Sequence, residues 1–422
     1  MSRSRRFSRL LTDIGPLRES RDFRRLWFGL SVSQLGQQMT AVTVAYQVYI
    51  LTRSSFAVGL VGLYALIPLI AGGLYGGALV DAFDRRKVAL VTALGMWICS
   101  GILVLQAVLD LESVALLYAV VAAQSALFAV NNPARQAILP RLLTKESLPA
   151  ANALTMASFN LGFTVGPLLG GFIIGWHGVQ TAYVIDAITF SAAVYALLRL
   201  PPIPPPNGNG RAPGLKSVAE GLRFLAKAPN LRMTFIVDLC AMVLAQPRAL
   251  FPALALTVYA GNASTLGMLQ AAPAIGSLLA FLVSGWISRV HRHGIAIAVA
   301  VVVYGASVAA AGFSAMGLPG MLWLGVTFLA LSGSADMVSA AYRSTMLQSA
   351  APDELRGRLQ GVFVVVVAGG PRLGDFLAGS LASLTSEETA MVVGGFACIL
   401  GVGLSMARTR KFAAYDARQP TP

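Results

Sequence analysis

The chain contains twelve stretches that are long and apolar enough to cross a lipid bilayer as helices, and this pattern limits its fold more than any other feature. About 20 apolar residues are needed to cross about 30 Å of hydrocarbon. Unbroken apolar runs such as VALVTALGMW do not fit the alternating strands of a membrane barrel. Because helices satisfy their own backbone groups in lipid, the sequence predicts an all-α integral membrane protein. Its twelve transmembrane helices are predicted at residues 26–51, 56–79, 88–109, 114–133, 152–175, 180–199, 233–257, 264–287, 295–315, 320–342, 359–384 and 389–407.

The charged residues agree with this prediction and indicate an orientation. Only 12% of the 422 residues are charged, whereas a water-facing surface needs about a quarter. The net charge is +14, and almost all Lys and Arg lie in the two termini and in the segments 80–87, 134–151, 200–232, 288–294 and 343–358. The alternate loops carry Arg53 with Asp110, Glu112, Glu387 and Glu388. Lys and Arg collect on cytoplasmic loops, so both termini are predicted to be cytoplasmic. Charge spread over so many loops argues against nucleic acid as a partner, and the first 25 residues are too charged for a cleaved secretory signal.

An internal repeat divides the chain into two halves. At an offset of 208 residues, Gly77 aligns with Gly285, Arg135 with Arg343, and Gly171 with Gly379. An even number of helices in each copy gives both copies the same orientation, as in the parallel repeats of large 6+6 transporters. We therefore expect five regions: a cytoplasmic segment at 1–25, six-helix bundles at 26–199 and 233–407, a linker with an amphipathic helix at 200–232, and a cytoplasmic tail at 408–422.

The loop after the second predicted helix resembles the signature of the major facilitator superfamily. It reads Gly-xxx-Asp-xxx-Arg-Arg-Lys and comprises Gly77, Asp81, Arg85, Arg86 and Lys87. The resemblance implies the 6+6 fold of that superfamily and a cytoplasmic gate in which the aspartate and the cations connect the two halves. Ordinary clustering of basic residues at a cytoplasmic loop is the alternative. The second copy has Arg289 where the acid would stand, so only one complete gate motif is predicted.

The fifth predicted helix resembles the antiporter motif of the same superfamily, with Ala153 in place of its first glycine. The motif residues are Gly162, Gly166, Pro167, Gly170 and Gly171. In the superfamily this motif belongs to exporters, so the resemblance implies outward transport. Small residues at every fourth position also let helices pack closely, and packing without any bearing on direction is the alternative.

Polar residues are concentrated in the first, fourth, seventh and tenth spans, which a twofold repeat places around one central cavity. Gln47 and Asn131 belong to this polar set. Ionisable residues inside spans are costly and are candidates for function, although Arg372 and Asp375 could neutralise each other, and the glutamines could join helices by hydrogen bonds. The candidates for cargo contact or coupling are Gln34, Gln38, Gln124, Asp238, Arg248, Asp336, Arg372 and Asp375.

From about residue 20 to 410 the chain resembles the enterobactin exporter family, in stretches such as PRALFPALA and STMLQSAAPDELRGRLQGVF. The resemblance implies a monomeric, proton-coupled antiporter of the bacterial inner membrane that exports a siderophore or a comparable small amphiphile. Multidrug or macrolide efflux is an alternative, and a non-transporting receptor or scaffold is a further one. No GxxxxGK[ST] loop, metal-ligand cluster or nucleophile–base pair is present, so we predict no enzyme activity, no cofactor and no metal.

Overall fold

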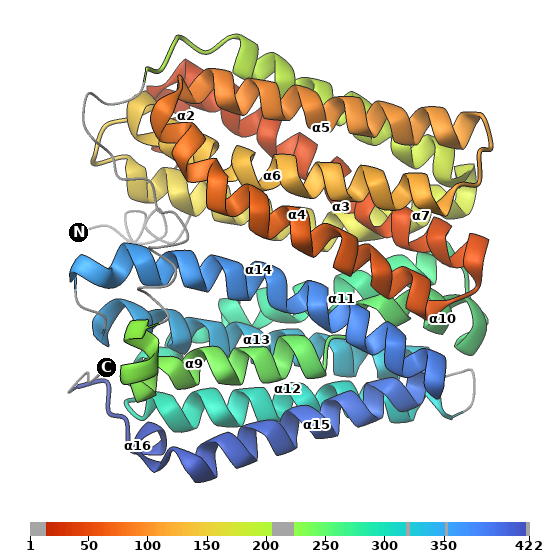
Figure 1. Ribbon diagram of the computed structural model, residues 1–422, viewed down its shortest axis with the longest axis vertical. Coiled ribbons are helices and arrows are strands. Elements are labelled where there is room, and N and C mark those ends of the chain that lie inside the picture. The colour runs from red at the N-terminus through yellow and green to blue at the C-terminus, as the bar shows by residue number, and fades with distance from the viewer. Residues whose placement is uncertain (1–13, 205–222, 318–320, 351–352, 419–422) are drawn as a thin grey trace, which may run out of the picture.

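The computed structural model describes residues 14–204, 223–317, 321–350 and 353–418, without the side chains at 74, 77, 78, 81, 353–365 and 410. Within these ranges the ordered elements are all helices (Figure 1). The amphipathic helix expected in the linker falls largely outside the described residues, of which 223–227 are helical.

The described part of the first half consists of six helices, four of which begin at a capping side chain. These helices are α2 (Gly15–Glu19), α3 (Arg21–Thr52), α4 (Ser55–Ala82), α5 (Arg85–Val108), α6 (Val114–Leu142) and α7 (Leu148–Leu198). Ser20, Ser54, Asp84 and Ser113 each accept a hydrogen bond from a backbone N–H of the first turn, which satisfies a donor that the helix leaves free. In α7 the chain reverses at Gly178, whose φ is 77°. The helices predicted at 152–175 and 180–199 are therefore joined by a single glycine.

The second half repeats this arrangement with one interrupted helix. It comprises α9 (Pro229–Leu239), η1 (Cys240–Leu244), η2 (Arg248–Leu250), α10 (Phe251–Ala253), η3 (Leu254–Val258), α11 (Ala263–Leu282), η4 (Ser284–Arg289), α12 (His293–Ala315), α13 (Leu322–Ala350), α14 (Asp353–Leu384), α15 (Glu387–Arg408) and α16 (Arg410–Ala413). The span predicted as one helix at 233–257 is broken near Pro247 into α, π and 3-10 pieces. Pro247 and Pro252 have no N–H to donate to the preceding turn.

Nine helices of the described part of the chain are long and apolar enough to cross a membrane. One of them is α7, whose 51 residues reverse at Gly178 and so serve two crossings. The glutamine-rich α3 and the partly described α14 coincide with two further predicted spans. The architecture is thus the predicted all-α membrane bundle, and it is consistent with twelve crossings.

Helix positions follow the offset of 208 residues closely. Ser55 and Ala263 open α4 and α11, and Val114 and Leu322 open α6 and α13, each pair being 208 residues apart. The counterpart of Gly178 is Ser386, which caps α15. The reversal inside α7 therefore corresponds to the loop between α14 and α15.

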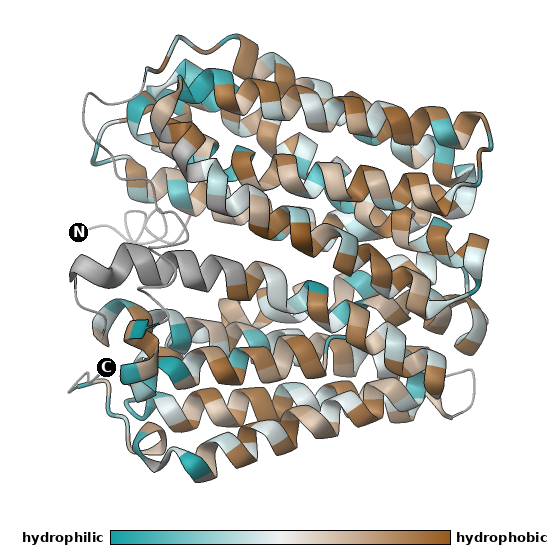
Figure 2. Cartoon of the chain, viewed as in Figure 1, coloured by the Kyte–Doolittle hydropathy of each residue, from teal (hydrophilic) through white to brown (hydrophobic). Residues whose placement is uncertain are grey.

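The helices of the two halves form two groups, which meet where α4 lies beside α14 and α7 beside α11 (Figure 1). Apolar residues cover most of each helix length, and polar residues gather toward the helix ends (Figure 2). One end of the bundle, which we name the basic face, is formed by the helix ends at Arg21, Ala82, Leu148, Leu198, Pro229, Arg289, Ala350 and Arg408. The other end of the bundle is named the opposite face.

Candidate functional site

The two halves touch along a first seam between α7 and α11. A Cβ atom built on Gly267 would lie 2.7 Å from the carbonyl oxygen of Pro167 and 3.2 Å from Cα of Gly171. A Cβ on Gly171 would in turn lie 2.9 Å from Cα of Gly267. Such distances leave no room for a side chain, so the two backbones are in direct contact. Pro167 and Gly171 of the predicted antiporter motif therefore belong to the contact between the halves.

A second seam joins α4 and α14 and is the repeat counterpart of the first. A Cβ on Gly59 would lie 2.6 Å from the carbonyl oxygen of Asp375, and one on Gly379 would collide with the backbone of Ser55. Gly59 and Gly267 are 208 residues apart, as are Gly171 and Gly379. Nearby, the Ser55 hydroxyl donates a hydrogen bond of 2.8 Å to Glu387 at the start of α15. Both seams lie toward the opposite face.

Toward the basic face the same helices separate, as the spreading of α4 and α14 in Figure 1 shows. Leu66 of α4 still faces α14, since a Cβ built on Gly369 would lie 3.1 Å from its Cδ1 atom. Gly73 lies two turns nearer the basic face on the same side of α4, and a Cβ built there would meet nothing within 4 Å. On α7, Phe159 and Phe163 precede Pro167 at intervals of four residues, so they continue the ridge that forms the first seam. Phe159 is exposed and Phe163 half-buried, so this part of the ridge is less covered than the buried Pro167 and Gly171 of the seam.

The other motif glycines of α7 pack within the first half. A Cβ on Gly162 would lie 2.7 Å from Cγ of Gln34, and one on Gly166 would lie 3.0 Å from the carbonyl oxygen of Leu35 and also press on Gln38. Gly170 packs on the backbone of Met39 in the same way. Gln34 and Gln38 are half-buried on α3 and lie beside α7, and Gln124 is half-buried on α6.

The cations of the signature loop bind carbonyl groups of their own half. Arg85 Nη1 donates to the carbonyl oxygen of Ala137 at 3.2 Å. Arg86 donates from Nε to Leu197 at 3.1 Å and from Nη2 to Leu198 at 2.6 Å, which places a positive charge at the C-terminal end of α7 where the helix dipole favours it. The exposed Lys87 lies in the first turn of α5, while Gly77 is in α4 and the side chain of Asp81 lies outside the described residues.

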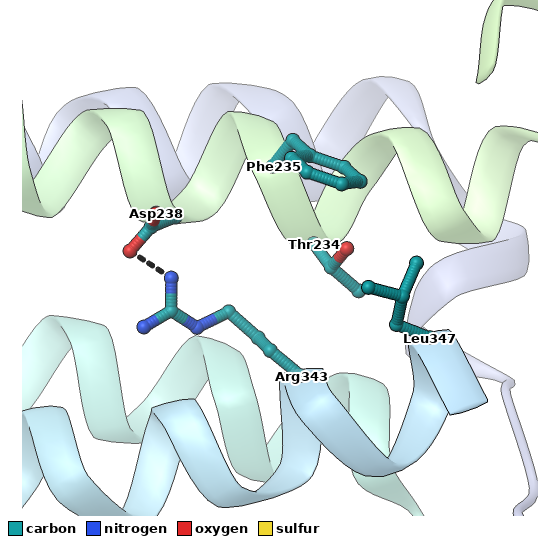
Figure 3. Close-up of a pocket in the computed structure, with 5 residues that line it drawn as sticks. All are labelled: Thr234, Phe235, Asp238, Arg343 and Leu347. Carbon is teal, nitrogen blue, oxygen red and sulfur yellow. Dashed lines mark ion pairs between the residues drawn. The ribbon is translucent and has the colours of Figure 1, made fainter. Parts of the chain in front are cut away.

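A buried arginine on α13 joins two predicted acids. Arg343 forms an ion pair through Nη1 with Asp238 on α9 and a 3.4 Å contact through Nη2 with Asp336 on its own helix. Figure 3 shows the guanidinium of Arg343 pointing at Asp238, with Thr234 and Leu347 to one side. The structure thus brings Asp238 and Asp336 together through a residue that was not among the predicted candidates.

A second set of charges lies between α13, α14 and the broken helix. Arg248 is exposed and its guanidinium carbon lies 5.8 Å from the ring centroid of Phe163 in the other half, a cation–π geometry. Arg248 also interacts electrostatically with Asp336 and Asp375, and Asp375 interacts with Arg372. These residues form a charged cluster that begins at the second seam, where the backbone of Arg372 and Asp375 contacts α4.

Two members of the predicted polar set do not face the space between the halves. Gln47 is buried and exchanges hydrogen bonds of 3.2 and 3.0 Å with Gln106, and Tyr183 donates a third to it. Asn131 is also buried and donates to Ala89 and Thr92 of α5. For these two residues the alternative of hydrogen bonding between helices holds, because buried amides need partners and find them on the neighbouring helices.

One acidic side chain on the basic face has a shifted pKa. Glu19 at the end of α2 accepts hydrogen bonds from the Ser147 hydroxyl and from the Thr144 backbone. The hydrogen bond from Ser147 is the main cause that lowers the pKa of Glu19 below its usual value. This contact ties α2 to the start of α7.

Comparison with known proteins gives a family and a fold. A family model described as transmembrane secretion effector matches residues 11–421. The chain is 29% identical over 419 residues to an enterobactin exporter, EntS, of Citrobacter koseri, covering 98% of this chain and 97% of that protein. It is also 29% identical over 393 residues to the protein of the same name from Escherichia coli, covering 92% of each.

Solved transporter structures share the arrangement of the helices. A variant of the nucleoside transporter NupG aligns with a TM-score of 0.76 at 14% identity, over 92% of this chain and 99% of that one. A bacterial homologue of the iron transporter ferroportin, in an inward-facing state, aligns with a TM-score of 0.69 at 16% identity, over 93% of this chain and 99% of that one. At these identities the likeness shows the fold alone.

Proposed function

Because the chain belongs to the transmembrane secretion effector family of the major facilitator superfamily, we propose that it is a secondary active exporter of a small amphiphilic molecule, with a siderophore as the favoured cargo. The relatives named enterobactin exporter support this choice. Family membership points to a transporter rather than an enzyme. We further propose that the protein works as a monomer, resides in the bacterial inner membrane with both termini in the cytoplasm, and exchanges cargo for protons.

The observation that carries this proposal is the unequal packing of the two halves. Glycine backbones seal the opposite face at Gly59, Gly171, Gly267 and Gly379, while Gly73 has open space toward the basic face. A protein that binds cargo from the cytoplasm and releases it outside needs a state that is open on one side and closed on the other. With the basic face in the cytoplasm, this structure corresponds to the state that loads cargo.

The proposed cargo position lies on the basic side of the seams, beside Arg248 and Phe163. The exposed Arg248 guanidinium suits an anionic group, and Phe159 and Phe163 form an aromatic pair with centroids 4.7 Å apart that suits a ring. An acidic aromatic molecule such as a catecholate siderophore would satisfy both.

Transport in proteoliposomes tests the proposal. The purified protein is reconstituted, a proton gradient is imposed, and the uptake of radiolabelled enterobactin is measured with and without a protonophore. We expect gradient-dependent accumulation that the protonophore abolishes. Accumulation that is equal in protein-free liposomes would contradict the assignment.

Two further arms make this test sharper. The variant Arg248→Met should weaken the apparent affinity for enterobactin by about 10- to 100-fold. This change corresponds to the loss of one hydrogen bond to a charged group, which contributes about 1.5–3 kcal/mol. The matched control, Arg223→Met, removes an exposed arginine outside the spans and should leave affinity unchanged. Replacing enterobactin by a macrolide distinguishes siderophore export from drug efflux, since the aromatic ridge at Phe159 and Phe163 alone would also accept an apolar drug.

A further inference from the structure

The cluster around Arg343 contains one more carboxylate than it has guanidinium groups. Asp238 and Asp336 both approach Arg343, so the three side chains carry a net charge of −1 when both acids are ionised. An uncompensated charge removed from water is costly. The cluster therefore needs one positive charge in addition to that of Arg343, and either the neighbouring Arg248 or a proton bound to Asp336 can supply it.

The two acids are placed unequally. The side chains of Asp238 and Arg343 are only 5% and 7% exposed and form the closer ion pair, whereas that of Asp336 is 37% exposed and lies 3.4 Å from Nη2. Asp238 is thus the fixed counter-ion of Arg343. Asp336 is the carboxylate that can leave the arginine and still reach water.

The first half lacks this arrangement although it has the arginine. Arg135 is the repeat counterpart of Arg343, and it contacts the amide oxygen of Asn131 at 3.4 Å. The positions that correspond to Asp238 and Asp336 are Leu30 and Phe128. Since the fold forms in the first half without these acids, their presence in the second half is not a requirement of the architecture.

Other charged and titratable groups surround Asp336 on the packed helices. Arg248 of η2 interacts electrostatically with it, and so does Tyr304 of α12, which also interacts with Arg248 and Asp375. A cavity of about 10 Å³, room for about one water molecule, adjoins the Asp238–Arg343 pair and is lined by Thr234 and Leu347. These two residues lie one turn nearer the basic face, so the cavity is on the basic side of the pair (Figure 3). Arg343 Nε has no hydrogen-bond partner among the described residues, which suits a water there.

We propose that Asp336 is the proton-carrying group of this exporter, with Arg343 and Asp238 as the fixed pair that positions it; the proposal rests on the proposed proton-coupled function. In the state open to the opposite face, the Asp336 carboxylate binds a proton from water, which forms an O–H bond and ends its attraction to Arg343. In the state described here the O–H bond breaks, the proton passes to water on the basic face, and the carboxylate returns to Arg343. Proton release and cargo loading thus occur in one state of the protein, and proton binding and cargo release occur in the other.

Infrared titration of the purified protein in lipid tests the proton site without any cargo. The carbonyl stretch of protonated carboxyl groups is followed against pH for the wild type and single variants. Asp336→Asn should lose one titrating component. Asp238→Asn should keep that component but move its midpoint to lower pH by about one unit, because Arg343 then faces Asp336 alone. Asp186→Asn, which removes a buried acid bound to Ser100 elsewhere, should leave the component in place.

Transport separates this role from a structural one. In proteoliposomes Asp336→Asn should reduce proton-driven accumulation of enterobactin by about tenfold or more, while exchange of internal for external enterobactin without a gradient continues at the wild-type rate. An unchanged infrared titration in Asp336→Asn, or an unshifted midpoint in Asp238→Asn, overturns the proposal. Loss of gradient-free exchange in Asp336→Asn also overturns it. A wild type that transports no enterobactin refutes the proposed cargo, and the infrared titration then decides the proton site alone.

Discussion

Among single residues, Gly178 has the most demanding backbone. Its φ of 77° and ψ of 176° lie in a region that is open almost only to glycine. A Cβ atom there would meet nothing within 4 Å, so the requirement for glycine comes from its own backbone and not from crowding. The reversal of α7 thus depends on one residue.

The variant Gly178→Ala should lower the free energy of unfolding by about 1–3 kcal/mol, the usual cost of such a conformation for other residues. Thermal unfolding in detergent measures this change. The repeat counterpart provides the control: Ser386 has an ordinary φ of −150°, and Ser386→Ala loses only a helix cap, worth about 1 kcal/mol. A loss for Gly178→Ala no larger than that for Ser386→Ala would contradict this interpretation.

Sequence patterns identified the glycines and intramembrane acids but missed the residue that connects the acids. The tenth span was predicted to end at residue 342, one position before Arg343, because the polar residues near the end of α13 lower the local hydropathy. The structure extends α13 to Ala350. Which acids an arginine contacts depends on which helices adjoin, and a hydropathy pattern does not contain that information. The break in the helix near Pro247 was not predicted for a related reason. The hydropathy of a span is averaged over all its residues, including those that break the helix.

At the scale of helices, the two glycine seams are equivalent by the repeat and should respond alike. Gly171→Ala and Gly379→Ala would each press a methyl group onto backbone of the other half. Overpacking of this kind costs about 1–3 kcal/mol, which corresponds to an approximately 5- to 150-fold change in an equilibrium. Both variants should therefore shift the protein away from the state that is closed on the opposite face.

Glu112 and Thr385 lie in opposite-face loops of different halves. Spin labels at these two positions report the shift as a longer distance between the labels in pulsed electron paramagnetic resonance. Gly73→Ala is the matched control, because it adds the same methyl group to a helix where nothing lies within 4 Å. It should leave the distance distribution unchanged. A shift in only one of the two seam variants would show that the seams are not equivalent.

At the scale of the whole molecule, export requires the opposite face to open. Ser55 and Glu387 are hydrogen bonded across the two halves at 2.8 Å, so cysteines at both positions should form a cross-link after the native Cys99, Cys240 and Cys398 are replaced. Oxidation of the Ser55→Cys/Glu387→Cys variant should lower the transport rate by at least about tenfold, and a reductant should restore the rate. Either single cysteine variant is the control. Full transport by the oxidised protein would exclude opening at this position.

The fully described connections on the opposite face are short: residues 53–54, 109–113, 259–262 and 385–386, together with the single reversal at Gly178. In the proposed orientation, these described connections offer few residues to the compartment beyond the membrane. They form only a small surface on which a second carrier protein could bind to accept the cargo. Under the proposed function, cargo released at this face therefore enters water directly.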